Sequence, residues 1–148
     1  MAIAIRTAQR TWEGPLASGT GTVRMGSGAA GELAVTWAAR TERADGKTSP
    51  EEPAAAAHSA CYAMALALRL GERKAIPERL AITATVTLGQ AGDVPAIASS
   101  HPGVTAQVPG LDKTAFDTVA GEASDLCPVS RLFAGAKVTV GATLEPAP

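Results

Sequence analysis

The chain contains two cysteines, Cys61 and Cys127, and no other residue type narrows the function as much. Cys61 lies in the Ala-rich run "AAAAHSACYAM", and Cys127 directly precedes a proline in "SDLCPVSRLF". Two thiols can form a structural disulfide, serve as small apolar core side chains, or react together as a redox dithiol. The residues around each cysteine predict different environments for the two.

If Pro128 is the first residue of a short helix, Cys127 is its cap; a Cys-Pro pair with no capping role fits these residues equally well. With Cys127 as the cap, its sulfur would lie beside unpaired backbone N–H groups, which stabilise a thiolate. Cys61 sits more than two turns inside a helix, so a reactive Cys61 needs a cation brought to it. The cationic candidates in the charged loop are Arg40, Arg43 and Lys47. An arginine suits best, because a guanidinium is always charged and donates in a fixed geometry.

Other interpretations stay open on the residues alone. Cys61 in an Ala-rich helix is also compatible with a small core residue. Glu51 is also compatible with a first-turn residue that only compensates the helix dipole. His58 shares a helix face with Cys61, which allows a Cys–His pair or part of a metal site. The chain has only two histidines and two cysteines, which disfavours a zinc centre.

Composition indicates one folded domain over residues 1–148, since 46% of the residues are hydrophobic. A net charge of -1 with no basic block gives no support for nucleic-acid binding. No run approaches the roughly 18 apolar residues of a membrane span, and the start lacks a signal-peptide pattern. Two cysteines in such a chain predict a cytoplasmic thiol pair. Aromatic residues make up only 3%, so the core is thin and a dimer would enlarge it.

Three short strands are predicted at the N-terminus, over residues 3–13, 19–25 and 31–39, separated by Gly-rich turns. A charged loop follows over residues 41–49.

A long helix is predicted after that loop. Ser49 would be its N-cap, Pro50 its first residue, and Glu52 the partner in an S-x-x-E capping box. The helix would continue to about Leu70 and end at Gly71. It is apolar nearly all round, which predicts that it is buried in the middle of the molecule.

The second half of the chain alternates strands and helices. Residues 80–89 alternate as a half-buried strand, with Ile82, Ala84, Val86 and Leu88 inward. Residues 94–110 predict a less regular strand or a pair of short ones. A helix over residues 111–126 would be capped by Asp112, and a final strand would cover residues 136–145. This order predicts an α+β fold.

Several motifs together resemble the OsmC/Ohr family of organic hydroperoxide reductases. They are "TWEG", "GTGTV", "TSPEE", "AAHSACYAMAL", "FDTVAGEA" and "CPVSR", with the two cysteines 66 positions apart. The resemblance covers essentially the whole chain. His58 and the TSPEE loop are closer to the OsmC branch, and no Gly-Gly-Arg element of the Ohr type lies near the N-terminus.

The resemblance implies antiparallel sheets around a long buried central helix, in an intertwined homodimer with two sites at the subunit interface. It implies that Cys61 is the peroxidatic thiol and Cys127 the resolving thiol. Glu51 matches the family's active-site glutamate. The family's arginine matches Arg40 best, and a gap in the alignment leaves Arg43 open.

The expected reaction is the reduction of an organic hydroperoxide to an alcohol, through a Cys61 sulfenic acid and a Cys61–Cys127 disulfide. Hydrogen peroxide would be reduced less efficiently. An external dithiol would regenerate the thiols, with a lipoyl protein as the family-level candidate. No metal, flavin or haem is expected. Apolar lining is expected from three residues, Met64, Leu68 and Phe133.

Helix geometry adds one constraint. Glu51 and Cys61 are ten residues apart, which separates their Cα atoms by about 15 Å along a straight helix. A site that uses both therefore needs Glu51 from the other subunit, with the two central helices antiparallel. Two rival functions remain: a non-enzymatic dimeric stress protein with buried structural thiols, and a Cys/His metal-binding module.

Overall fold

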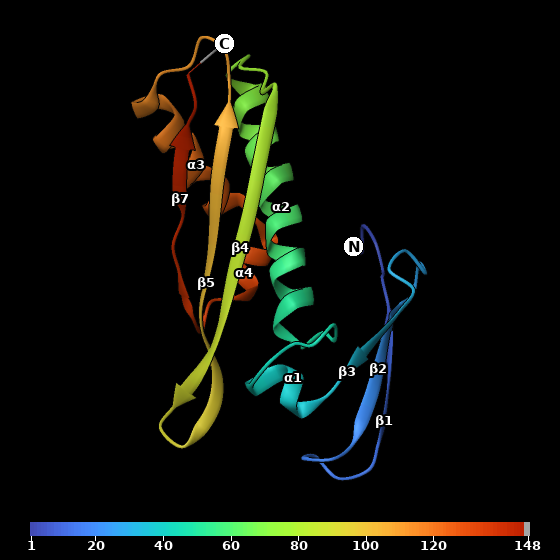
Figure 1. The fold of residues 1–148 in the computed structure, drawn as a ribbon. Coiled ribbons are helices and arrows are strands. Elements are labelled where there is room, and N and C mark those ends of the chain that lie inside the picture. The colour runs from blue at the N-terminus through green and yellow to red at the C-terminus, as the bar shows by residue number, and fades with distance from the viewer. Residues whose placement is uncertain (147–148) are drawn as a thin grey trace. The chain divides into compact units, whose positions relative to one another are not determined.

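The computed structural model describes residues 1–146 and has the α+β architecture that the sequence predicts (Figure 1). It divides into two compact units, Met1–Glu52 and the chain from Pro53 onward, and each unit is described by itself. The single domain expected over residues 1–148 stays a prediction.

The N-terminal unit contains a three-stranded antiparallel sheet in the order β1-β2-β3. Its strands are β1 (Ala8–Glu13), β2 (Thr20–Met25) and β3 (Glu32–Val35). The three predicted strands are confirmed, but each is shorter than expected, the second by only one residue. The first begins at residue 8 rather than 3, and the third ends at residue 35 rather than 39.

A short helix, α1 (Trp37–Thr41), replaces the predicted end of the third strand. Thr36 still has the extended backbone of a strand, but its hydroxyl accepts a hydrogen bond from the Ala39 N–H at 3.1 Å. This N-cap satisfies a free donor of the helix and starts α1 where alternation predicted more strand. The consequence for function is that Arg40 lies in the last turn of a helix.

Helix α2 (Glu51–Glu72) begins one residue later than predicted and passes through Gly71 to end at Glu72. Glu52 is also hydrogen-bonded to a different residue from the predicted Ser49. Its Oε2 accepts a hydrogen bond of 2.6 Å from the Thr48 hydroxyl. Glu51 and Glu52 still lie in the first turn, where carboxylates complement the positive end of the helix dipole.

The prediction that α2 is buried nearly all round is wrong for the single chain. Its buried residues lie toward one face: His58, Tyr62, Ala65, Leu66 and Leu70. Met64 and Leu68 are instead 73% and 54% exposed. An apolar strip of α2 therefore has no cover within its own unit.

The second unit is built on an antiparallel pair of long strands, β4 (Arg79–Ala91) and β5 (Val94–Gln107). Gly92, with φ 62°, allows the tight turn between them. The alternation predicted for residues 80–89 is confirmed. Residues 94–107, expected to be irregular, form one continuous strand whose register shifts once, opposite Thr87 and Leu88. This shift is a β-bulge, which accommodates one extra residue in β5 without ending the strand.

The last strand was predicted as one piece over residues 136–145 but is two, β6 (Lys137–Val138) and β7 (Gly141–Leu144). Both pair with β5 in parallel, so this sheet is mixed rather than wholly antiparallel. Helices α3 (Lys113–Leu126) and α4 (Pro128–Leu132) precede them. Asp112 caps α3 as predicted, accepting a hydrogen bond from the Ala115 N–H at 2.8 Å.

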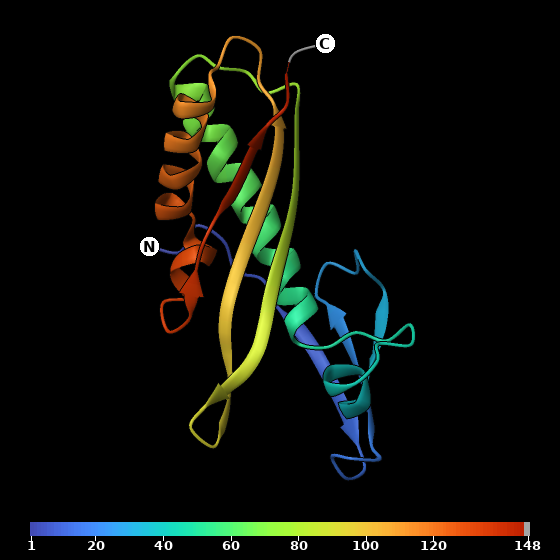
Figure 2. The same cartoon turned by 60° about the vertical axis from the view of Figure 1, so that its left-hand side comes forward.

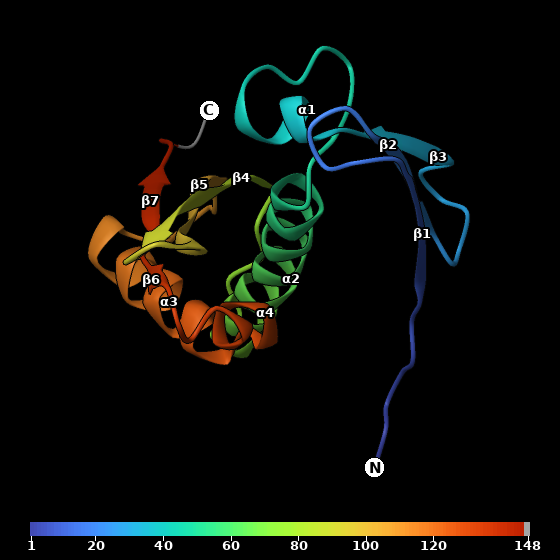
Figure 3. The same cartoon turned by 90° about the horizontal axis from the view of Figure 1, so that it is seen from below.

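Helices α2, α3 and α4 cover one face of the β4–β5 sheet (Figures 2 and 3). The core lies between them and contains Tyr62, Leu66, Leu70, Val104, Ala106, Phe116, Val119 and Cys127. The Tyr62 hydroxyl ties α2 to α3 by donating to the Ala120 carbonyl at 2.9 Å. Over residues 1–146, none of the helices has the length and apolarity to span a membrane.

Candidate functional site

The two cysteines, 66 positions apart in sequence, are neighbours in the second unit. Cys61 lies half-buried on α2 and packs against the core cluster that contains the fully buried Cys127. Each thiol affects the ionisation of the other: Cys127 raises the pKa of Cys61, and Cys61 helps to lower the pKa of Cys127. Both cysteines are free thiols in this structure.

Cys127 occupies the helix-capping position, one of the two possibilities that the sequence left open. It is the N-cap of α4, and its sulfur accepts a hydrogen bond from the Ser130 N–H at 3.5 Å. Burial opposes ionisation, but the Ser130 N–H and hydroxyl, the Cys61 thiol and the backbone of Val129 together lower the pKa of Cys127. The surroundings therefore favour a thiolate at this position.

Cys61 has the opposite electrostatic environment. Burial raises the pKa of the Cys61 thiol, and the adjacent Cys127 sulfur raises it further, against one backbone hydrogen bond from Val129. As the sequence analysis expected, Cys61 within its own unit lacks the help that Cys127 receives from a helix terminus. A reactive Cys61 needs a positive charge from elsewhere.

His58 does not form the Cys–His pair that its helix face suggested. Its Nδ1 lies 2.5 Å from the Ser100 Oγ and its Nε2 lies 2.8 Å from the Ser130 Oγ. Phe133 stacks on the imidazole, with ring centroids 5.2 Å apart. The ring is fully buried, and this burial lowers the pKa of His58, which keeps the imidazole neutral.

Arg40 and Glu51 are brought together in the N-terminal unit. The Arg40 Nε and Nη2 donate to the Glu51 Oε1 at 3.0 and 2.7 Å. Burial opposes ionisation of Glu51, but the hydrogen bond from Arg40, with others from the Glu51 backbone and Ser49, lowers the pKa of Glu51. A guanidinium has five N–H donors, and Glu51 engages two of them. The carboxylate thus orients the guanidinium.

The other cationic candidate behaves differently. Arg43 lies 3.8 Å from Asp45, and both side chains are largely exposed. An exposed pair of this kind is worth little and fixes no geometry. Of the two arginines left open by the sequence, Arg40 is the one that Glu51 holds.

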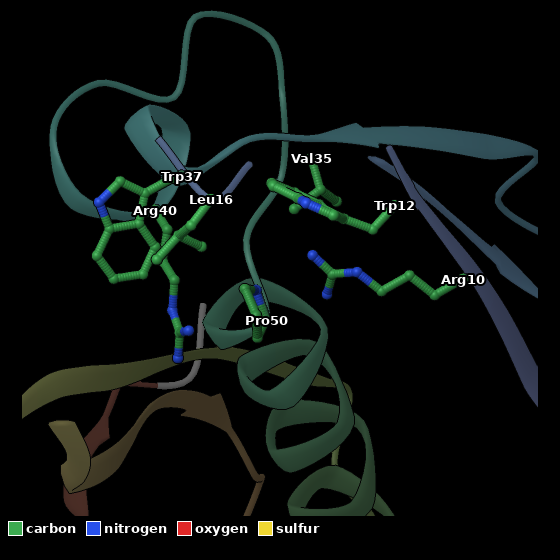
Figure 4. Close-up of a pocket in the computed structure, with 7 residues that line it drawn as sticks. All are labelled: Arg10, Trp12, Leu16, Val35, Trp37, Arg40 and Pro50. Carbon is green, nitrogen blue, oxygen red and sulfur yellow. The ribbon is translucent and has the colours of Figure 1, made fainter. Parts of the chain in front are cut away.

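A pocket of about 270 Å³ lies against this ion pair, within the N-terminal unit. Figure 4 shows the indole rings of Trp12 and Trp37 at its two ends, with Leu16 and Val35 between them. Arg40 contributes to its wall, with its guanidinium carbon 6.0 Å from the centre of the Trp37 ring. The pocket therefore combines apolar walls with a positive charge.

The residues predicted to line an apolar pocket are in different positions. Met64 and Leu68 are exposed on α2, and Phe133 is stacked on His58. Their role toward a substrate stays a prediction. Among residues 1–146, no three His, Cys, Asp or Glu side chains gather in a way that could hold a metal ion.

Four residues near the two thiols and the Arg40–Glu51 pair were not predicted from the sequence: Ser100, Ser130, Trp12 and Trp37. No local sequence pattern indicates that the two serines contact His58, because they are 42 and 72 positions from it in the chain. The two tryptophans could have been recognised as pocket candidates, since they are the only two in the sequence and both lie near turns in the N-terminal segment.

Comparison with known proteins gives close relatives over most of the chain. A family model described as OsmC-like protein matches residues 43–141. The protein is 38% identical over 125 residues to peroxiredoxin OsmC of Escherichia coli strain K12, covering 84% of this chain and 87% of the relative. Peroxiredoxin OsmC of Shigella flexneri matches to the same extent.

Solved structures of low sequence identity share the fold. An organic hydroperoxide resistance protein OsmC from Legionella pneumophila has a TM-score of 0.72 at 21% identity, over 99% of this chain and 100% of that one. An organic hydroperoxide resistance protein from Elizabethkingia anophelis has a TM-score of 0.73 at 24% identity, over 97% and 100%. With the sequence matches, these similarities establish that the chain belongs to the OsmC family.

Proposed function

We propose that this protein is a thiol-dependent peroxidase that reduces organic hydroperoxides to alcohols. The observation that supports the proposal is that Cys61 packs against the core cluster that contains Cys127, and both are free thiols that a disulfide could join. The family membership supports it, since the curated relatives are peroxiredoxins.

In the proposed cycle, the Cys61 thiolate attacks the distal oxygen of the hydroperoxide. An S–O bond forms, the O–O bond breaks, and the departing alkoxide takes a proton to become the alcohol. The sulfur is oxidised by two electrons to sulfenic acid. Cys127 then displaces hydroxide from that sulfur, giving water and the Cys61–Cys127 disulfide. An external dithiol reduces the disulfide, and a lipoyl protein in a reducing cytoplasm fits that role.

Arg40 is the proposed source of the charge that Cys61 needs. A guanidinium held by Glu51 stabilises both the attacking thiolate and the negative charge that develops on the departing oxygen. Arg40 would therefore act on kcat as well as on substrate binding.

A homodimer is proposed to bring the two groups together. Helix α2 is continuous from Glu51 to Glu72, so Glu51 and Cys61 are separated by about 15 Å along its axis. The Arg40–Glu51 pair that serves Cys61 would then come from the partner subunit. The exposed Met64 and Leu68 share a helix face with Cys61 and would be covered by that partner.

The pocket beside Arg40 is proposed to hold the organic group of the hydroperoxide. Its aromatic walls favour a bulky apolar substituent over hydrogen peroxide, which has nothing to bury there. Trp37→Ala is expected to lower kcat/KM for cumene hydroperoxide by about 10–200-fold, because the lost apolar contact is worth roughly 1–3 kcal/mol. The expected loss with hydrogen peroxide is much smaller, and steady-state assays with both substrates measure the difference.

Trp12→Ala is a second variant in the same pocket and should give the same selective loss. An equal loss with both peroxides in both variants would contradict a role in binding the organic group.

The order of the two thiols is tested with Cys127→Ser. One equivalent of cumene hydroperoxide should still consume the remaining thiol, because Cys61 attacks first, but the enzyme should then stall as the Cys61 sulfenic acid. Trapping with dimedone and mass spectrometry identifies this species. The native protein should instead lose two thiols per chain and trap no dimedone.

Loss of the first turnover in Cys127→Ser would mean that Cys127 is the attacking thiol and Cys61 the resolving one. The outcome is informative because the surroundings of Cys127 lower its pKa, which favours attack by Cys127. Unchanged thiols in the native protein would favour the structural interpretation of both cysteines.

A further inference from the structure

Behind Cys127 lies a chain of buried polar side chains that the proposed cycle does not use. It joins three elements: Ser100 on β5, His58 on α2 and Ser130 on α4. His58 and Ser100 are fully buried, and Ser130 is 7% exposed. Burying three polar groups in an apolar core costs stability unless each is hydrogen-bonded, so their arrangement calls for a physical reason.

The hydrogen bonds among Ser100, His58 and Ser130 can all donate in the same direction, toward Cys127. A neutral imidazole carries one N–H, and burial keeps His58 neutral. If that proton is on Nε2, His58 donates to the Ser130 Oγ and accepts from the Ser100 hydroxyl at Nδ1. Ser130 then has its single hydroxyl proton free to donate to the Cys127 sulfur, to which the N–H of the same residue already donates at 3.5 Å, and the Ser130 side chain helps to lower the pKa of Cys127.

The sulfur end of the chain fits this direction. The Ser130 N–H already donates to the Cys127 sulfur at 3.5 Å, which makes that sulfur an acceptor. The titratable groups that face it from α2 are Cys61 and Tyr62. Tyr62 donates its proton to the Ala120 carbonyl instead, and burial raises its pKa, so it stays neutral.

We propose that His58 is a positioning residue for Cys127: its Nε2–H fixes Ser130 so that the serine hydroxyl donates to the sulfur and holds it as a thiolate. The part that concerns catalysis rests on the proposed function. During condensation, the Cys127 thiolate attacks the Cys61 sulfenic sulfur, the S–S bond forms and the S–O bond breaks. The hydroxide released takes a proton from solvent, and the Ser130 proton stays on its oxygen.

The same donors would serve the return step. Cys127 is fully buried and Cys61 is only half-buried, so a reducing dithiol reaches Cys61 first. Its thiolate attacks the Cys61 sulfur and Cys127 departs as a thiolate, received by Ser130. The second thiol of the reductant then displaces the Cys61 thiolate. A leaving thiol of lower pKa departs faster, so one hydrogen-bond chain would speed both steps.

The state of Cys127 can be measured without peroxidase activity. In Cys61→Ser, Cys127 is the only thiol left, and its ultraviolet thiolate absorbance as a function of pH gives its pKa. Adding Ser130→Ala or His58→Phe should raise that pKa by about one unit, because one donor to the anion is lost or turned away. Adding Ser130→Thr, which keeps the hydroxyl, should restore the parent value.

The other histidine provides the matched control. His101 also lies on β5 and bonds a hydroxyl, the Thr139 Oγ1 at 2.7 Å, but it directly follows Ser100 in the strand, so its side chain lies on the opposite face of the sheet. His101→Gln should leave the pKa of Cys127 unchanged. If Ser130→Ala, which removes only one oxygen, also leaves it unchanged, the proposal is overturned.

Single-turnover kinetics separates this proposal from the proposed function. With Cys61 intact, Ser130→Ala and His58→Phe should form the sulfenic acid at the normal rate and the disulfide about tenfold more slowly at neutral pH. The slower step should recover as the pH is raised. Disulfide formation at the parental rate, with the parental pH profile, would contradict the positioning role. Failure of the native protein to form any sulfenic acid would count against the peroxidase alone, because the pKa measurement would still decide the role of His58.

Discussion

Cys61→Ser is expected to abolish hydroperoxide reduction, lowering kcat/KM by at least about 10⁴-fold. The reaction requires a sulfur that can be oxidised by two electrons, and a serine hydroxyl has no such chemistry. Cys61 is half-buried on α2, so the substitution changes one atom at a site with room for it. Consumption of cumene hydroperoxide in the presence of dihydrolipoamide measures the effect.

The control for this substitution is the same change at the other cysteine. Cys127→Ser should keep the first turnover, whereas Cys61→Ser should lose it together with all later ones. Equal circular dichroism and thermal melting of the two variants would show that neither is misfolded. Substantial activity in Cys61→Ser would overturn the proposed function and leave the thiols with a structural role.

Local patterns in the sequence predicted the elements that depend on neighbouring residues. Asp112 caps α3 and the alternation around Ile82 and Val86 marks β4, both as expected, and Cys127 caps α4, as the sequence allowed. Each signal lies within a few residues of the element that it defines. The two thiols could be placed on α2 and at the start of α4 for the same reason.

Features that depend on distant partners were not predictable in this way. β5 is continuous because β4 pairs with it over its whole length, although the sequence predicted a less regular strand or a pair of short ones over residues 94–110. β6 and β7 both pair with β5, a strand about 40 positions earlier in the chain, so their bounds depend on a distant partner. Helix α1 depends on the side chain of Thr36, whose type suits a strand equally well.

The candidate site was predictable in its residue types but not in its supporting contacts. Glu51 pairs with Arg40 and not with Arg43. This choice depends on helix α1, which the alternating pattern of residues 31–39 did not predict. The position of His58 on the face of Cys61 suggested a direct contact. The structure instead gives His58 two serine partners from other elements, which no spacing within α2 could reveal.

The exposed apolar strip of α2 favours assembly of the protein with a second copy of itself. Leaving Met64 and Leu68 in water is costly for a protein with so few large apolar residues, and burying them against a second copy would offset that cost. The same contact would supply Cys61 with the charge that its own surroundings lack.

Subunit complementation is expected to show that each site is shared between two chains. Arg40→Ala should lower kcat/KM by about 10²–10³-fold as a homodimer, since it removes the donors that stabilise the departing oxygen. Cys61→Ser should be inactive. A heterodimer of the two, purified through different affinity tags, should recover about half of the wild-type activity. One of its sites combines an intact Cys61 with an intact Arg40 from the other chain.

The reciprocal heterodimer makes the test decisive. Wild-type chain paired with a chain carrying both Cys61→Ser and Arg40→Ala should be nearly inactive, because each shared site then contains one defect. If Arg40 served Cys61 within its own chain, the results would exchange: the double-variant heterodimer would keep about half of the activity and the complementing one would have almost none. The comparison uses the same substitutions in both assemblies, so differences in folding cannot mimic either outcome.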